Sequence, residues 1–224
     1  MAQALQQGIG GPRGFFDSSL PTAVFLVVYL VSGSQLSVSL WAALAAGALI
    51  AVLRMVRKES LQQIVGGIFG VGVAAFIASR TGKAEDFFLP GIITNVAYAT
   101  AFAISAAIRK PLLGYIAGGI TGHPLAWRDY PRARRAAVLA SWLWAGMFGL
   151  RLLVQVPLYF AAAIGPLGVV KLIMGWPLFL LVSYMTYRIL APEFSTIAEI
   201  ETAKAEEASA TTPSEEKSTV EESD

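Results

Sequence analysis

The sequence contains no cysteine and only one histidine, which removes several kinds of chemistry. Without cysteine the chain can form no disulfide and perform no thiol catalysis. His123 stands in a Gly-His-Pro turn with no cluster of acids around it, so we expect a loop residue rather than a metal ligand. The sequence offers no carboxylate pair and no Ser-His-Asp set. We therefore expect no enzyme activity, no metal and no cofactor.

Charge is also scarce and unevenly distributed. Charged residues make up 14% of the chain, against about a quarter in soluble domains. Residues 1–190 hold 15 Lys and Arg but 5 Asp and Glu, whereas residues 191–224 hold 2 and 10. We predict a flexible N-terminus over 1–14, a transmembrane domain over 15–190 and an acidic cytoplasmic tail over 191–224. The tail is poor in aromatics and predicted to be disordered, apart from a helical stub near Phe194.

The apolar body divides into runs that are long enough to cross a bilayer, which takes about 20 apolar residues. An early run over 20–53 is too long for one helix and is cut at Ser32-Gly33-Ser34-Gln35. The predicted spans cover residues 17–31, 36–53, 61–79, 88–108, 138–163 and 167–190. Pro177, close to Gly175, predicts a kink in the last of them. The fold class is all-α, an integral membrane helical bundle of about six transmembrane helices plus a short interfacial helix.

The connecting loops predict how the chain is oriented. Loops 54–60 and 109–137 carry three and six Lys or Arg, loop 80–86 carries two, and loop 32–35 carries none. Because short cytoplasmic loops are enriched in these residues, the richer loops are predicted to be cytoplasmic. The protein would then be a multi-pass protein of the cytoplasmic membrane, with both termini in the cytoplasm.

One motif occurs twice in the body. The pattern R-K-x-x-L-x-x-I-x-G-G-I-x-G fits residues 57–70 and 109–122. A phosphate-binding loop would need Gly-Lys-Ser/Thr, which is absent, and the match does not extend outward as a duplication would. Both copies place glycines four residues apart, which lets helices pack closely in lipid. The predicted helix-packing residues are Gly66, Gly70, Gly114, Gly118 and Gly122.

The second copy is too short to span the membrane. Residues 112–122 would make about 16 Å of helix, roughly half the hydrocarbon thickness. The segment is predicted to lie along the cytoplasmic interface or to enter the membrane and return, with Trp127 and Tyr130 beside it. The predicted lipid-headgroup-binding residues are Arg109, Lys110, Arg128, Arg132, Arg134 and Arg135. A plain loop whose charges only set the topology is the alternative.

Arg151 is the main candidate for a functional residue inside a span, because an ionisable side chain is costly there. Gln155 follows one turn later on the same helix face. Residues at the mouths of neighbouring spans, and Asn95 farther inside one of them, are predicted to join them in a polar pocket that opens outward. This predicted pocket contains Arg151, Gln155, Asn95, Asp86, Glu85 and Lys171. Alternatively, Arg151 forms a structural ion pair or extends its side chain to the membrane surface.

Three stretches are the most distinctive of the chain. They are R-T-G-K-A-E-D-F-F-L-P-G at 80–91, L-R-L-L-V-Q-V-P-L-Y at 150–159 and M-G-W-P-L at 174–178. Through them the chain resembles, over about residues 9–190, an uncharacterised family of actinobacterial multi-pass membrane proteins without an assigned activity. Its helix order is similar, more distantly, to the intracellular septation protein A family, inner-membrane proteins linked to envelope construction and division. That second likeness transfers no site residues.

Two classes of function remain open. The first is a non-enzymatic scaffold or a factor associated with the cell envelope and septation, which the distant resemblance favours. The alternative is a small-solute or ion transporter or channel that uses the region of Arg151. Anionic lipids are the expected partners, together with other membrane or envelope proteins. We expect no nucleic-acid partner, and homo-oligomerisation stays open.

Overall fold

The structure is a computed structural model that describes residues 11–59 and 61–221, and the side chains of 19–59 and 64–207. These residues form helices joined by turns, with no strand among them. The elements are α2 (Gly11–Val31), α3 (Leu36–Val56), α4 (Leu61–Thr81), η1 (Ala84–Phe88), α5 (Leu89–Ala107), α6 (Leu112–Ile120), η2 (Ala126–Asp129), α7 (Pro131–Phe160), α8 (Ile164–Ile173) and α9 (Trp176–Glu221).

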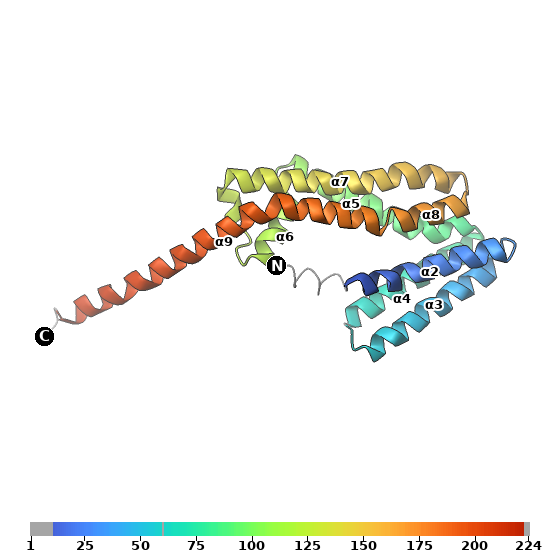
Figure 1. Cartoon of the computed structure of the whole chain (residues 1–224), viewed down its shortest axis with the longest axis horizontal. Helices are drawn as coiled ribbons and strands as arrows, with labels where there is room; N and C mark the ends of the chain where they lie inside the picture. The colour runs from blue at the N-terminus through green and yellow to red at the C-terminus, as the bar shows by residue number, and fades with distance from the viewer. Residues whose placement is uncertain (1–10, 60, 222–224) are drawn as a thin grey trace. The chain divides into compact units, whose positions relative to one another are not determined.

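The predicted spans are confirmed as helices (Figure 1). Five helical stretches among the described residues are long and apolar enough to cross a membrane, and Ser19–Val31 is a shorter apolar helix. Large apolar side chains remain exposed on them, including Val31 at 83%, Phe160 at 81% and Trp41 at 73%. A soluble monomer rarely leaves so much apolar surface uncovered, whereas lipid covers it at no cost. The chain is therefore an all-α membrane protein; the direction in which it is inserted stays a prediction.

The split of the long early run falls where the sequence predicted it. Gly33 and Ser34 both take left-handed backbone conformations, with φ of 69° and 68°. The N–H of Ser34 donates to the carbonyl of Tyr29, which closes the end of α2. The chain thus reverses within a few residues and continues as α3.

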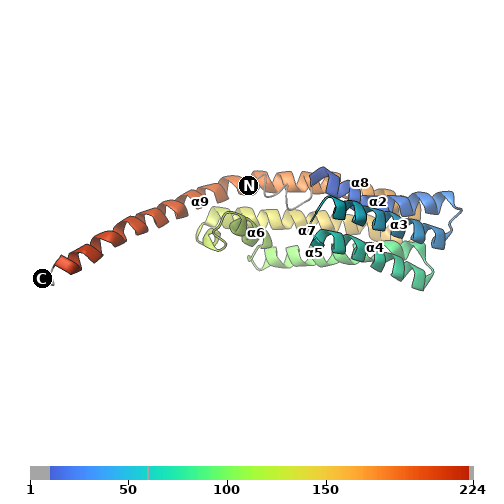
Figure 2. The same cartoon turned by 90° about the horizontal axis from the view of Figure 1, so that it is seen from below.

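The chain divides into two compact units, and the first comprises residues 1–100 and 146–181. Within it, α3 lies beside both α2 and α4 (Figures 1 and 2). Three aromatic rings meet in its core: the ring of Phe25 stacks on Phe87 with a centroid distance of 4.0 Å and meets Phe88 edge-on. Helix α8 packs on α2, where a Cβ at Gly168 would lie 2.7 Å from Cδ2 of Leu26. This glycine, which the sequence analysis did not select, sets the close approach of the two helices.

The sixth predicted span is broken rather than merely kinked. Helix α8 ends at Ile173 and α9 begins at Trp176. The N–H of Gly175 donates to the carbonyl of Leu172 at 3.3 Å, a tighter turn than an α-helix makes. Pro177 has no N–H and so cannot restore the next helical hydrogen bond. The interruption lies where the sequence predicted one, but it is a break between two helices and not the predicted kink within one helix.

The second unit comprises residues 101–145 and 182–224. The short helix predicted after residue 111 is present as α6, and it packs on η2. The indole N–H of Trp144 donates to the hydroxyl of Thr186 at 2.8 Å, which joins α7 to α9 within this unit. The position of α6 at the membrane interface stays a prediction.

The acidic tail begins inside a packed helix. Helix α9 continues through Glu221, and Phe194 and Ile197 are buried at 1% and 3% exposure. The hydroxyl of Tyr130 donates to the carboxylate of Glu201 at 3.1 Å. The predicted boundary at residue 190 therefore falls within the packed part of α9, while the disorder of the tail stays a prediction. Of the predicted flexible segment 1–14, residues 1–10 lie outside the described residues and α2 already begins at Gly11.

Candidate functional site

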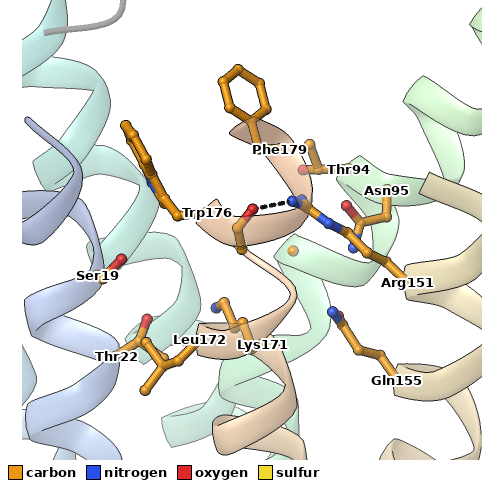
Figure 3. Close-up of a pocket in the computed structure, with 12 residues that line it drawn as sticks. Ser19, Thr22, Thr94, Asn95, Arg151, Gln155, Lys171, Leu172, Trp176 and Phe179 are labelled. Carbon is orange, nitrogen blue, oxygen red and sulfur yellow. Dashed lines mark hydrogen bonds between the residues drawn. The ribbon is translucent and has the colours of Figure 1, made fainter. Parts of the chain in front are cut away.

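A cavity of about 470 Å³, with both polar and apolar walls, lies in the first unit at the break between α8 and α9 (Figure 3). Four spans contribute to it: α2, α5, α7 and the α8–α9 pair. The lining residues are Ser19, Thr22, Gly91, Thr94, Asn95, Arg151, Gln155, Lys171, Leu172, Gly175, Trp176 and Phe179. Four of the six predicted pocket residues, namely Arg151, Gln155, Asn95 and Lys171, therefore share one cavity.

Arg151 reaches from α7 to the broken span. Its Nη2 donates to the backbone carbonyl of Gly175 at 2.6 Å (Figure 3). Within the described part of the chain its buried Nε has no hydrogen-bond partner, and no carboxylate there pairs with the guanidinium. The ion pair considered for Arg151 is thus not found among the described residues. A guanidinium that is incompletely paired inside a span is costly, which favours a function for it over a purely structural role.

Lys171 adds a second cation from α8. Its Nζ lies 5.1 Å from the ring centroid of Phe88 and would be 3.7 Å from a Cβ at Gly91. The ring faces of aromatic residues attract ammonium groups, so this contact holds the side chain at the cavity wall. Lys171 forms no ion pair with a described carboxylate.

Two amide side chains also line the cavity, and no acid of the described residues does. Asn95 and Gln155 are buried at 8% and 5% exposure, and their amides have no hydrogen-bond partner among the described residues. No Asp or Glu of the described chain lines the cavity. Two cations and two amide groups that can donate hydrogen bonds make the cavity suited to an anion.

Asp86 and Glu85 do not line the cavity, so the structure does not join them to the other four residues of the predicted pocket. Asp86 lies in η1 with 5% of its surface exposed, and it accepts a hydrogen bond from the hydroxyl of Tyr159. The 3₁₀ turn and the aromatic core around Phe87 hold the carboxylate against the end of α7. Asp86 is thus part of the packing at the predicted outer end of the unit, and Arg151 is not its partner.

The Tyr159–Asp86 bond gives a stability prediction. Tyr159→Phe removes the donor and leaves a buried carboxylate acceptor unsatisfied, at a cost of about 1–3 kcal/mol. We expect the detergent-solubilised variant to unfold at a lower temperature than wild type. Tyr98→Phe is the matched control, because Tyr98 is 50% exposed and its ring stacks on Phe148 without a hydroxyl bond. Equal melting temperatures for the two variants would contradict the assignment.

Several lining residues gave no signal in the sequence. Ser19 and Thr22 lie in α2, and small hydroxyl residues are common near the ends of apolar spans. Trp176 and Phe179 are apolar, so chemistry alone does not distinguish them from lipid-facing residues. The one informative signal was the Gly175-Trp176-Pro177 stretch, because a break in a span exposes backbone groups that need a polar neighbour.

The predicted packing glycines separate into three kinds. A Cβ at Gly114 would lie 2.9 Å from the ring of Trp127, and one at Gly118 would lie 2.9 Å from the carbonyl of His123. Gly114 thus packs against an η2 residue and Gly118 against the turn at His123 and Pro124, rather than against another membrane span. Gly122 takes a φ of 83° and has nothing within 4 Å of its Cβ position, so it serves the turn. Gly66 and Gly70 also have nothing among the described residues within 4 Å of their Cβ positions, so helix packing at these two glycines stays a prediction.

The six predicted lipid-binding residues do not share one site in the structure. Arg109, Arg134 and Arg135 line one groove. Arg128 instead donates to the hydroxyl of Tyr115, and its guanidinium lies 5.2 Å from that ring. Arg132 lines a different groove, formed by residues around Tyr130 and Pro192. Lys110 is exposed and lines neither.

The apolar spans, the broken sixth span and the polar residues within it define a multi-pass helical membrane protein. Residues 9–196 match the family described as "Protein of unknown function (DUF3159)", so the chain belongs to that family. No curated protein and no solved structure matches the chain. The resemblance to an uncharacterised family is confirmed; the likeness to septation proteins stays a prediction.

Proposed function

We propose that this protein binds a small organic anion in the cavity at the α8–α9 break and carries it across the membrane. One observation carries the proposal: Arg151 and Lys171 come from different helices to line a cavity that no described acid lines. The volume of about 470 Å³ lies within the 300–1,000 Å³ typical of small-molecule sites. The proposed activity is non-enzymatic and needs no cofactor.

The broken span supports transport beyond binding. Discontinuous helices in transporters place backbone dipoles at a substrate site, and helix N-termini favour anionic groups. Here α9 starts at Trp176, on the cavity wall. Arg151 bonds the carbonyl of Gly175 inside the break. An anion that competes for the guanidinium would loosen this bond and let the two half-helices move.

The walls suggest the kind of anion. Trp176 and Phe179 lie with their ring centroids 6.0 Å apart on one side of the cavity, and Arg151 lies near Asn95 on the other (Figure 3). An anion with an apolar body fits these two surfaces better than a bare inorganic ion. We therefore propose a carboxylate or phosphate ester that carries an apolar group.

Uptake into proteoliposomes tests the proposal. Labelled benzoate, succinate and inorganic phosphate are offered at equal concentrations, with glucose and lysine as neutral and cationic controls. We expect saturable benzoate uptake above that of empty liposomes, and none of glucose or lysine, because two cations line the site. Lysine uptake, or no uptake of any anion, would reject the transport function.

A scaffold linked to the cell envelope is the second candidate. It is supported by the α4 face that carries Gly66 and Gly70, where Val65 and Phe69 are 63% and 70% exposed. Small residues beside exposed apolar side chains suit the packing of a helix from another membrane protein. Two results together would favour this candidate. Proteoliposomes would take up no anion, and cells that lack the protein would insert a fluorescent wall precursor differently from wild-type cells. Both proposals include a location in the cytoplasmic membrane, with the two termini in the cytoplasm.

A further inference from the structure

A groove in the second unit combines a cationic end with an apolar wall. Its volume is about 430 Å³, and its lining residues are Arg109, Arg134, Arg135, Val138, Leu139 and Trp142. We call these six residues the arginine groove. Arg109 follows α5, whereas the other five lie between Arg134 and Trp142 in α7. The groove is separate from the cavity around Arg151, so it stands independently of the proposed transport.

Buried serine hydroxyls fix Arg109 relative to α7. Arg109 has a φ of 56°, and the N–H of Lys110 donates to the carbonyl of Ser105 at 3.0 Å, which closes the end of α5. The hydroxyl of Ser105 accepts a bond from the N–H of Leu112 at 3.3 Å. The hydroxyl of Ser141, which is fully buried in α7, accepts the N–H of Leu113 at 3.5 Å. The connection between α5 and α6 is thereby tied to α7, so Arg109 belongs to a built site.

The cationic end has no counter-ion among the side chains that the structure describes. No described carboxylate pairs with Arg109, Arg134 or Arg135, and all three are exposed. Arg134 and Arg135 also lie at the N-terminal end of α7, at its fourth and fifth residues, where the helix dipole adds positive potential. Three guanidinium groups that no described carboxylate pairs with, beside a helix start, attract an anionic group with several acceptor oxygens, such as a phosphodiester.

The apolar wall identifies which phosphate compound fits. Leu139 and Trp142 are 58% and 49% exposed. Trp142 lies about 10 Å farther along the helix than Arg135, at 1.5 Å per residue. The groove thus runs from guanidinium groups to apolar side chains along a span that enters the membrane. A soluble phosphate would use only the first part, whereas a phospholipid uses both.

We infer that the arginine groove binds one anionic phospholipid, with the headgroup phosphate on Arg109, Arg134 and Arg135 and an acyl chain along Leu139 and Trp142. The sequence predicted that six cations contact lipid headgroups, and the inference concerns fewer of them and a single lipid. It assigns three of the six predicted cations to one bound lipid. It leaves Lys110, Arg128 and Arg132 with no part in it.

Native mass spectrometry of the full-length, delipidated protein in detergent tests the inference. The probes are dioleoylphosphatidylglycerol and dioleoylphosphatidylcholine, each titrated separately. We expect one tightly held phosphatidylglycerol per chain and weaker phosphatidylcholine binding. The variant Arg109→Gln/Arg134→Gln/Arg135→Gln should lose affinity for phosphatidylglycerol on the order of 100-fold, at roughly fivefold per basic side chain.

The same loop supplies the matched control. Lys110→Gln/Arg128→Gln/Arg132→Gln removes the same charge and should keep wild-type affinity. Arg109→Gln alone should lose roughly fivefold, which keeps the test decisive if the triple variant folds poorly. If both triple variants lost the same affinity for phosphatidylglycerol, binding would depend only on the total positive charge of the loop. That result would overturn the inference. Displacement of the lipid by equimolar glycerol phosphate would also overturn it, because a soluble anion would then suffice.

Discussion

Arg151→Gln should reduce anion uptake into proteoliposomes by about 10- to 100-fold. Loss of one charged hydrogen bond to a bound anion costs about 1.5–3 kcal/mol, which corresponds to this factor. The half-saturating concentration should rise, because the guanidinium contacts the anion directly in the proposed site. Arg151→Lys should recover only part of the uptake, since an ammonium keeps the charge but not the planar set of donors.

Two further variants separate anion binding from structural support. Lys171→Gln removes the second cation without removing a hydrogen bond to a described residue, so the protein should fold normally and still lose uptake. Arg80→Gln is the matched control, because Arg80 lies at the exposed end of α4 and lines no part of the cavity. Similar uptake by Arg80→Gln and Lys171→Gln would mean that the cavity does not carry the anion.

Gly118→Ala should destabilise the second unit by about 1–3 kcal/mol relative to Gly119→Ala, as overpacking does. Both substitutions lie in α6 and gain the same helix propensity, so their difference isolates the new contact. A Cβ at Gly118 would lie 2.9 Å from the carbonyl of His123 and 3.0 Å from Cα of Pro124, whereas one at Gly119 has nothing within 4 Å. The backbone of the turn must therefore move in the first variant only.

The movement can be measured at a single introduced thiol, because the chain has no cysteine of its own. Ala126→Cys places the thiol in η2, next to the buried Trp127. Maleimide labelling should become faster when Gly118→Ala is added and stay unchanged when Gly119→Ala is added. Equal rates in the two backgrounds would show that the turn does not rest on α6 at Gly118.

The sequence predicted the spans and their interruptions well because these depend on local properties. The length of an apolar run decides whether a helix can cross lipid. The break at Gly175 and Pro177 follows from backbone chemistry at those two residues. Arg151 was identifiable because a charge inside a span is costly wherever its neighbours lie.

Local properties of the sequence could not predict which residues of different helices contact each other. Asp86 was grouped with Arg151 because both were expected on the same side of the membrane, yet it accepts its bond from Tyr159. The rotation of each helix about its axis decides such pairs. That rotation depends on contacts such as Gly168 with Leu26, which join α8 to α2 across more than a hundred residues of chain.

The sequence by itself determined the class of fold, the places of the apolar helices and the place of the disturbance in the last span, because hydrophobic length and glycine or proline positions act within one segment. Only the tertiary structure decided which polar side chains line the cavity and which three arginines share a groove. It also decided which glycines of α6 pack against Trp127 and against the turn at His123 and Pro124. The physical reason is that helix periodicity fixes the angle between residues on one helix but says nothing about the face that a neighbouring helix presents to them.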